Sequence, residues 1–97
     1  MVEHLVFLKL KNDASEDDYH KIISSLKELP SKMDVIKRLK VGRNFSQRNK
    51  GYGIGLSVTL NDETSLKIYR DHPDHVEVLD RIIKRCLEDV IAIDFVD

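Results

Sequence analysis

The sequence predicts an α+β fold in which helices cover one face of a four-stranded antiparallel sheet. Apolar residues repeat with the periods of strands and helices in the order β, α, β, β, short α, α, β, which is typical of a split βαβ unit. The chain has 97 residues, enough for one hydrophobic core and too few for two. We therefore expect one domain over residues 1–97.

The composition is that of a folded protein without a strong charge preference. Hydrophobic residues make up 41% and charged residues 34%, with only four Gly and two Pro, which excludes disordered and low-complexity classes. Sixteen basic and seventeen acidic residues give a net charge of -1. Because no positive excess attracts phosphates or anionic lipids, we expect neither a nucleic acid nor a membrane as partner.

The sequence also indicates the cellular compartment of the protein. Its longest apolar runs span only a few residues, and its start lacks a basic region followed by an apolar one, so we expect no transmembrane helix and no signal peptide. A single cysteine, Cys86, excludes an intrachain disulfide and is compatible with a reducing compartment. The expected location is the cytoplasm.

The first part of the chain predicts a strand, a helix and a second strand. Residues 4–10 are rich in Val, Phe and Leu and carry apolar groups on both faces, which is typical of an interior strand. Ser15 offers an N-cap for a helix that ends at Pro30. Its stripe of helically spaced apolar residues consists of Tyr19, Ile22, Ile23, Leu26 and Leu29. Residues 35–42 alternate and predict a half-exposed strand.

The middle of the chain predicts a loop followed by a strand. Residues 43–53 are polar, basic and punctuated by glycines, and we expect an irregular, mobile loop. Its glycines lead into a strand rather than a helix N-terminus, so a phosphate cradle is not expected. In residues 54–60, Ile, Leu and Val alternate with Gly, Ser and Thr, which indicates a strand with one bulky and one small face.

The last part of the chain predicts two helices and a strand. Asn61 and Asp62 can cap a short helix to about Arg70, and Pro73 suits the first position of a helix to about Asp89. Residues 90–96 are rich in Val and Ile and predict the final strand. The apolar stripe expected for the longer helix is Val76, Leu79, Ile82, Ile83, Cys86 and Leu87.

The first strand indicates that both faces of the sheet are covered. Leu5 and Phe7 lie on one of its faces, and Val6 and Leu8 on the other. Helices on one face cannot bury both sets, and an open apolar face is an association site. A symmetric homodimer that buries two such faces against each other is therefore expected.

Four segments together resemble the stress-responsive dimeric α/β-barrel family. The specific one is Tyr-Arg-Asp-His-Pro-Asp-His-Val at residues 69–76, and the others are Glu-His-Leu-Val at 3–6, Val-Gly at 41–42 and Asp-Phe at 94–95. The resemblance covers essentially the whole chain. It implies a ferredoxin-like βαββαβ monomer, a dimeric α/β barrel made by two face-to-face sheets, and a cleft between sheet and helices in each subunit.

Plant polyketide cyclases of this family imply roles for individual residues. In them a Tyr and the second His of the motif act together, the His as general base and the Tyr on the substrate carbonyl. The matching positions here are Tyr69 and His75. Where the cyclase has pocket-shaping aromatic residues on its first helix, this chain has Ile23 and Leu26. Ile54 stands where the cyclase has a strand histidine.

The residue pattern by itself also favours a cleft lined by His75, Tyr69 and His4. His75 precedes Leu79 by four residues and so lies above the apolar stripe of its helix, near enough to His4 to share a cleft. Imidazole exchanges protons near neutral pH, and a phenol such as Tyr69 can donate a hydrogen bond to a carbonyl or enolate. Alternatively, His75 and Tyr69 complete the edge of the core, and His4 is a satisfied edge histidine.

The first histidine of the motif, His72, has two interpretations. His72 and His75 are three residues apart and could share a helix face for a metal, with Asp71 or Asp74 adding oxygen ligands. Pro73 favours the other interpretation, in which His72 lies outside the helix and caps it. We therefore expect no metal site and count His72 among residues near the ligand.

The leading hypothesis is a homodimer that binds a small, largely apolar, carbonyl-bearing molecule. His75 and Tyr69 are expected to anchor it, with His4, His72, Ile23, Leu26 and Ile54 around it. If the protein is an enzyme, we expect proton transfer beside the carbonyl without a cofactor, as in a cyclase, isomerase or lyase. The alternatives are a non-catalytic stress-response or structural homodimer with structural histidines, and cofactor-dependent monooxygenase-like chemistry, which no residue favours.

Overall fold

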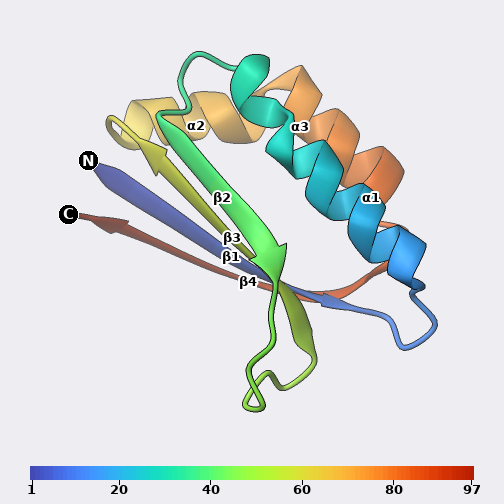
Figure 1. Cartoon of the computed structure of the whole chain (residues 1–97). Coiled ribbons are helices and arrows are strands. Elements are labelled where there is room, and N and C mark those ends of the chain that lie inside the picture. Colours follow the sequence, from blue (N-terminus) through green and yellow to red (C-terminus); the bar gives the residue numbers. More distant parts are fainter.

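The computed structural model describes residues 1–97 as a four-stranded sheet with a layer of helices on one face (Figure 1). In chain order the elements are β1 (Val2–Leu10), α1 (Glu16–Lys27), the 3₁₀ turn η1 (Leu29–Ser31), β2 (Arg38–Arg43), β3 (Tyr52–Leu60), α2 (Glu63–Asp71), α3 (Pro73–Val78), the π-helical turn η2 (Leu79–Ile83) and β4 (Leu87–Val96). All neighbouring strands are antiparallel in the order β2-β3-β1-β4. The predicted ferredoxin-like α+β fold and the interior position of the first strand are confirmed.

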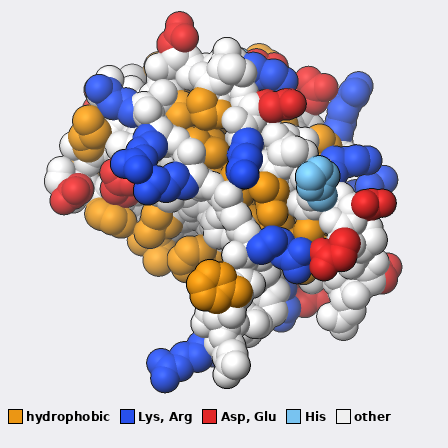
Figure 2. Space-filling view, in the orientation of Figure 1, with side chains coloured by type: hydrophobic (Ala, Val, Ile, Leu, Met, Phe, Trp, Pro, Cys, Tyr) orange, Lys and Arg blue, Asp and Glu red, His pale blue; other side chains and the backbone are white.

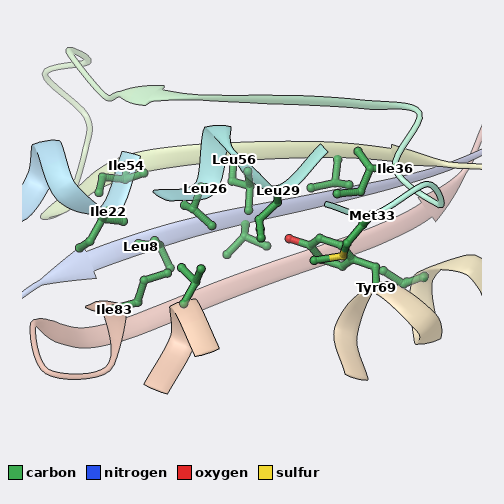
Figure 3. Close-up of a cluster of buried hydrophobic side chains, with 14 of the residues drawn as sticks. Leu8, Ile22, Leu26, Leu29, Met33, Ile36, Ile54, Leu56, Tyr69 and Ile83 are labelled. Carbon is green, nitrogen blue, oxygen red and sulfur yellow. The ribbon is translucent and has the colours of Figure 1, made fainter. Parts of the chain in front are cut away.

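The core lies between the sheet and the helices. Alternate residues of β1 and β3 point into it, because successive side chains of a strand face opposite sides of a sheet. From the helical layer, Ile22 and Leu29 are fully buried. Figure 3 shows side chains from both layers meeting in one cluster, with Tyr69 reaching into it from α2. The predicted bulky face of β3 is therefore the face that packs on the helices.

Helix α1 begins as the sequence predicts. Ser15 is its N-cap, and the Ser15 hydroxyl accepts a hydrogen bond from the Asp18 backbone N–H while the Asp18 carboxylate accepts one from the Ser15 N–H. This reciprocal capping box satisfies two backbone donors that the first turn leaves without helical partners. The buried side chains of this helix, Ile22 and Leu26, belong to the predicted apolar stripe.

The second strand begins later than predicted. Residues 35–37 precede β2, and the Ile36 N–H donates to the Met33 carbonyl in a turn. This turn points both Met33 and Ile36 into the core, where they are 2% and 8% exposed. The alternating pattern that predicted a strand from Val35 is thus produced by a buried turn.

The last helix is shorter than predicted. The helical segment ends with η2, and β4 already begins at Leu87, which pairs with Leu10 of β1. Residues 87–89, which were predicted to be helical, are therefore part of a strand that pairs with β1. Val76, predicted to lie on the buried stripe, is 41% exposed, whereas Val78 is buried. The face of α3 that packs on the sheet is rotated from the predicted one.

The face of the sheet opposite the helices is uncovered and apolar along β1 and β4. Its large exposed side chains are Phe7, Ile91, Ile93 and Phe95, which are between 38% and 48% exposed. Figure 2 shows hydrophobic side chains gathered on the side of the molecule away from the helices, next to Lys and Arg side chains over β2. This arrangement matches the expectation that helices cover only one face.

Removal of the N-cap of α1 tests how much this cap stabilises the fold. We expect Ser15→Ala to lower the free energy of unfolding by about 1 kcal/mol, because the Asp18 backbone N–H loses the hydroxyl that caps it. Ser24→Ala in the same helix is the matched control, since the Ser24 hydroxyl only donates back to helix carbonyls at His20 and Lys21. Urea unfolding measures both variants, and equal losses would contradict the capping role.

Candidate functional site

A cleft of about 340 Å³ lies between the helix-facing side of the sheet and α2, α3 and η2. Ten of its thirteen lining residues are hydrophobic, and the polar remainder brings together His4, Arg70 and His75, with the Tyr69 phenol among them. The full lining is His4, Val6, Leu8, Leu26, Leu56, Tyr69, Arg70, His75, Leu79, Ile83, Leu87, Val90 and Ala92. An apolar cleft with few convergent polar groups is the usual form of a small-molecule site.

A larger hollow of about 570 Å³ lies on the opposite, open face of the sheet beneath the loop between β2 and β3. Its polar lining comes mostly from exposed loop residues, and Arg43 is already paired with Glu16 at 2.6 Å. No histidine lines it. The cleft on the helix side is therefore the better candidate site, although it is smaller.

Tyr69 lies at the centre of the candidate site. Asp62 caps α2, which positions Leu66 and Tyr69 on its buried face. The Tyr69 side chain is 0% exposed, and its hydroxyl has no hydrogen-bond partner within the protein. Burial raises the pKa of the Tyr69 phenol to about 12. The hydroxyl therefore stays protonated and remains available as a hydrogen-bond donor.

His75 packs against the Tyr69 ring, with 4.5 Å between the ring centroids. Its Nδ1 lies 3.0 Å from the backbone carbonyl oxygen of Arg70. Because a carbonyl can only accept, Nδ1 carries the proton, and Nε2 of the neutral ring keeps its lone pair. Burial lowers the pKa of His75, as do the nearby His4 and His72, against the Arg70 hydrogen bond. His75 is thus a neutral imidazole with a free basic nitrogen.

His4 contacts Tyr69 from strand β1. It is 7% exposed, and its ring lies edge-on to Tyr69 with the centroids 5.7 Å apart. The β1–β4 register places Asp94 directly across from it, and His4 Nδ1 is hydrogen-bonded to the Asp94 carboxylate. A carboxylate that accepts from Nδ1–H fixes the tautomer and orientation of the ring. His4 thus lines the cleft and is also hydrogen-bonded at the sheet edge, so both interpretations of it stay open.

The structure brings together four of the predicted site residues, namely Tyr69, His75, His4 and Leu26. The other three lie elsewhere. His72 caps α3, and its Nδ1 accepts from the Asp74 N–H at 3.1 Å. Ile23 is half-buried on α1, and Ile54 is buried in the core at 1% exposure. None of these three lines the cleft.

Sequence reasoning missed Asp94 and Arg70 as site residues. Asp94 is 90 positions from His4 in the chain, and only the strand register reveals that the two are opposite each other. Arg70 has a local signal, since it follows Leu66 by four residues and so extends the buried face of α2 toward the cleft. No three His, Cys, Asp or Glu side chains are grouped so that they could hold a metal ion.

The fold is that of a ferredoxin-like protein, with two histidines and a tyrosine in a cleft between sheet and helices. The chain belongs to the stress-responsive A/B barrel domain family, whose model matches residues 2–97. The comparison with curated protein sequences finds no match. None of the helices is long and apolar enough to cross a membrane.

Solved structures with the same fold include dimeric proteins and an enzyme. A dimeric protein of unknown function from Bacteroides fragilis is 26% identical, with a TM-score of 0.85 over 97% of this chain and 93% of that one. A dimeric ferredoxin-like protein of unknown function from Thermobifida fusca is also 26% identical, with a TM-score of 0.85 over 97% and 88%. The hydroxynitrile lyase from Passiflora edulis is 19% identical, with a TM-score of 0.84 over 97% and 90%.

The lowered pKa of His75 predicts a specific loss of stability in mild acid. Below about pH 6.5, the ordinary imidazole pKa, the unfolded chain takes up a proton that folded His75 resists. His75 therefore contributes stability above this pH, and the contribution is lost as the pH falls through its lower folded pKa. We expect His75→Gln to lose less stability than wild type between about pH 7.5 and pH 5.5.

Urea unfolding across this pH interval measures the difference. His20→Gln is the control, since His20 is an exposed residue of α1 outside the cleft and its substitution should leave the wild-type slope unchanged. Identical pH slopes for wild type and His75→Gln would show that burial does not disfavour the charged form of His75.

Proposed function

We propose that the protein binds a small apolar carbonyl compound in the helix-side cleft and transfers a proton at the carbon beside the carbonyl. The observation that carries this proposal is the buried, unpartnered hydroxyl of Tyr69 between two histidines in an apolar cleft. A buried hydroxyl without a partner costs about 1–3 kcal/mol, and a ligand carbonyl oxygen would relieve that cost.

The geometry supports distinct roles for the two catalytic residues. Tyr69 donates its O–H to the carbonyl oxygen and stabilises the negative charge that develops there as an enolate forms. Nε2 of His75 accepts the proton from the adjacent carbon, since Nδ1 is committed to the Arg70 carbonyl. His4, held by Asp94, forms part of the cleft wall. This chemistry needs no cofactor.

A proton transfer of this kind begins cyclase, isomerase and lyase reactions alike. One protein with this fold, from Passiflora edulis, is a hydroxynitrile lyase. Because its identity to this chain is low, that structure supports the fold alone. We place the protein in the cytoplasm, which suits its single, buried cysteine, Cys86.

We further propose that two copies pair through their open sheet faces, as the dimeric structural neighbours suggest. The large side chains on β1 and β4 lie beside Gly42 and Gly55, which are paired across β2 and β3 with open space above both. A two-fold axis parallel to the strands would set the bulky side chains of one sheet over the glycines of the other. Such packing buries Phe7 and Ile93, which a monomer leaves exposed.

Hydrogen–deuterium exchange of a simple ketone tests the proposed chemistry. In D₂O, wild type is expected to accelerate exchange of the protons beside the carbonyl of 2-octanone, followed by NMR. His75→Gln should lower the accelerated rate about 100-fold, because the general base is removed. Tyr69→Phe should lower it by a similar factor, because the hydrogen bond to the enolate oxygen is lost.

His20→Gln controls for the loss of a histidine as such, since His20 lies outside the cleft. If wild type binds the ketone in calorimetry without accelerating exchange, the site binds and does not catalyse. If it neither binds nor exchanges the ketone and His75→Gln merely destabilises the fold, the proposal is wrong and the histidines are structural.

Substitution on the open sheet face tests the dimer. We expect Ile93→Lys to convert the protein from a dimer to a folded monomer at micromolar concentration, because it places a charge in the proposed interface. Ile68→Lys is a closely matched control, since Ile68 on α2 is 47% exposed and Ile93 is 48% exposed. Sedimentation equilibrium measures both, and a monomeric wild type or a dimeric Ile93→Lys variant would refute this interface.

A further inference from the structure

The mouth of the helix-side cleft carries an unpaired positive charge. Arg70 is the only lining residue whose side chain is permanently charged. Arg70 lies in the last turn of α2, four residues after the buried Leu66, and lines the cleft there. Arg70 is exposed, whereas Tyr69 next to it is fully buried. The two residues thus provide a charged group at the rim and a neutral donor inside.

No group within the protein neutralises Arg70. Other basic side chains do pair with carboxylates, as Arg81 does with Glu77 and Arg85 with Asp18, but Arg70 takes part in no ion pair. No carboxylate lines the cleft, and the Asp94 carboxylate is hydrogen-bonded to His4, which does line it. Tyr69 and His75 add no compensating negative charge, since both are neutral side chains in the folded protein. The cleft therefore presents one free cation to a ligand.

We propose that the ligand is a keto acid, whose carboxylate pairs with Arg70 at the mouth while its apolar chain and its keto group extend inward to Tyr69. This inference rests on the proposed function and adds the chemical class of the ligand. A guanidinium binds a carboxylate through two parallel hydrogen bonds, and an apolar, partly enclosed mouth strengthens that pair relative to bulk water. Because the carboxylate stays at the mouth, the keto end of the molecule is the end that enters the cleft.

A matched pair of probes isolates the carboxylate. 7-Oxooctanoate is 2-octanone with a carboxylate in place of the far methyl group, and its methyl ester keeps the ketone and the chain but has no charge. We expect wild type to bind the acid about tenfold more tightly than the ester in isothermal titration calorimetry, a factor typical of one charge-assisted pair.

Two variants assign this preference to Arg70. Arg70→Gln should weaken acid binding about tenfold and leave ester binding unchanged, since the backbone carbonyl that holds His75 is retained. Lys67→Gln removes the same charge from the exposed side of the same helix and should leave both affinities unchanged. A role for Arg70 only at the negative end of the α2 dipole would change stability without changing the acid-to-ester ratio.

The outcomes separate this inference from the proposed function. Equal binding of acid and ester by wild type, or an unchanged acid-to-ester ratio in Arg70→Gln, overturns the keto-acid assignment while the carbonyl site stands. An equal loss in Lys67→Gln also overturns it, because the effect would then be one of net charge. If neither probe nor 2-octanone binds wild type, the carbonyl site itself is wrong and the assignment falls with it.

Discussion

The pairing of β1 with strands on both of its edges is the constraint on which the core and the site both depend. β1 is hydrogen-bonded to β3 on one side and β4 on the other. Its alternation turns His4, Val6 and Leu8 to the helix-facing side of the sheet. A shift of one residue would turn His4 to the open face and bring Phe7 under the helices. The hydrophobic pattern that fixes the register therefore also fixes the position of the histidine.

The break between α2 and α3 is the second determinant of the site. Pro73 disfavours a helical conformation of the preceding residue, and His72 is extended with φ -64° and ψ 135°. In a continuous helix the Arg70 carbonyl would accept from the N–H of Asp74. Here that N–H donates to His72, and the freed carbonyl accepts from His75. One proline thus makes His72 the cap of α3 and frees the carbonyl that selects the tautomer of His75.

The sequence predicts those parts of the molecule that are specified by local periodicity. The helix capped at Ser15 and the strand that includes Ile54 follow from spacings of 3.6 and 2 residues, which report directly on burial. The end of the last helix is different, because Leu87 continues a helical apolar pattern while pairing with Leu10 decides its structure. Long-range pairing overrides the local signal there.

The same distinction applies to the site. Tyr69 and His75 are six residues apart, and the resemblance of their motif already predicts that they share a site. The partner of His4, Asp94, depends on a register set across nearly the whole chain, which no local pattern contains. His72 shares the motif with His75 and yet lies outside the cleft, because the proline between them turns one ring to the helix end and the other to the sheet.

His4, Tyr69 and His75 are not hydrogen-bonded to one another. This argues against a purely structural role for the three side chains. A closed structural trio would pair the Tyr69 hydroxyl with a histidine nitrogen, and both rings are close enough to pack on Tyr69. Instead, His4 is bonded to Asp94, His75 to the Arg70 carbonyl, and the Tyr69 hydroxyl to no protein group. Phenylalanine at this position would fill nearly the same volume without an unsatisfied donor. The site therefore combines one free donor with a free basic nitrogen, which is the complement of a carbonyl group with a removable proton beside it.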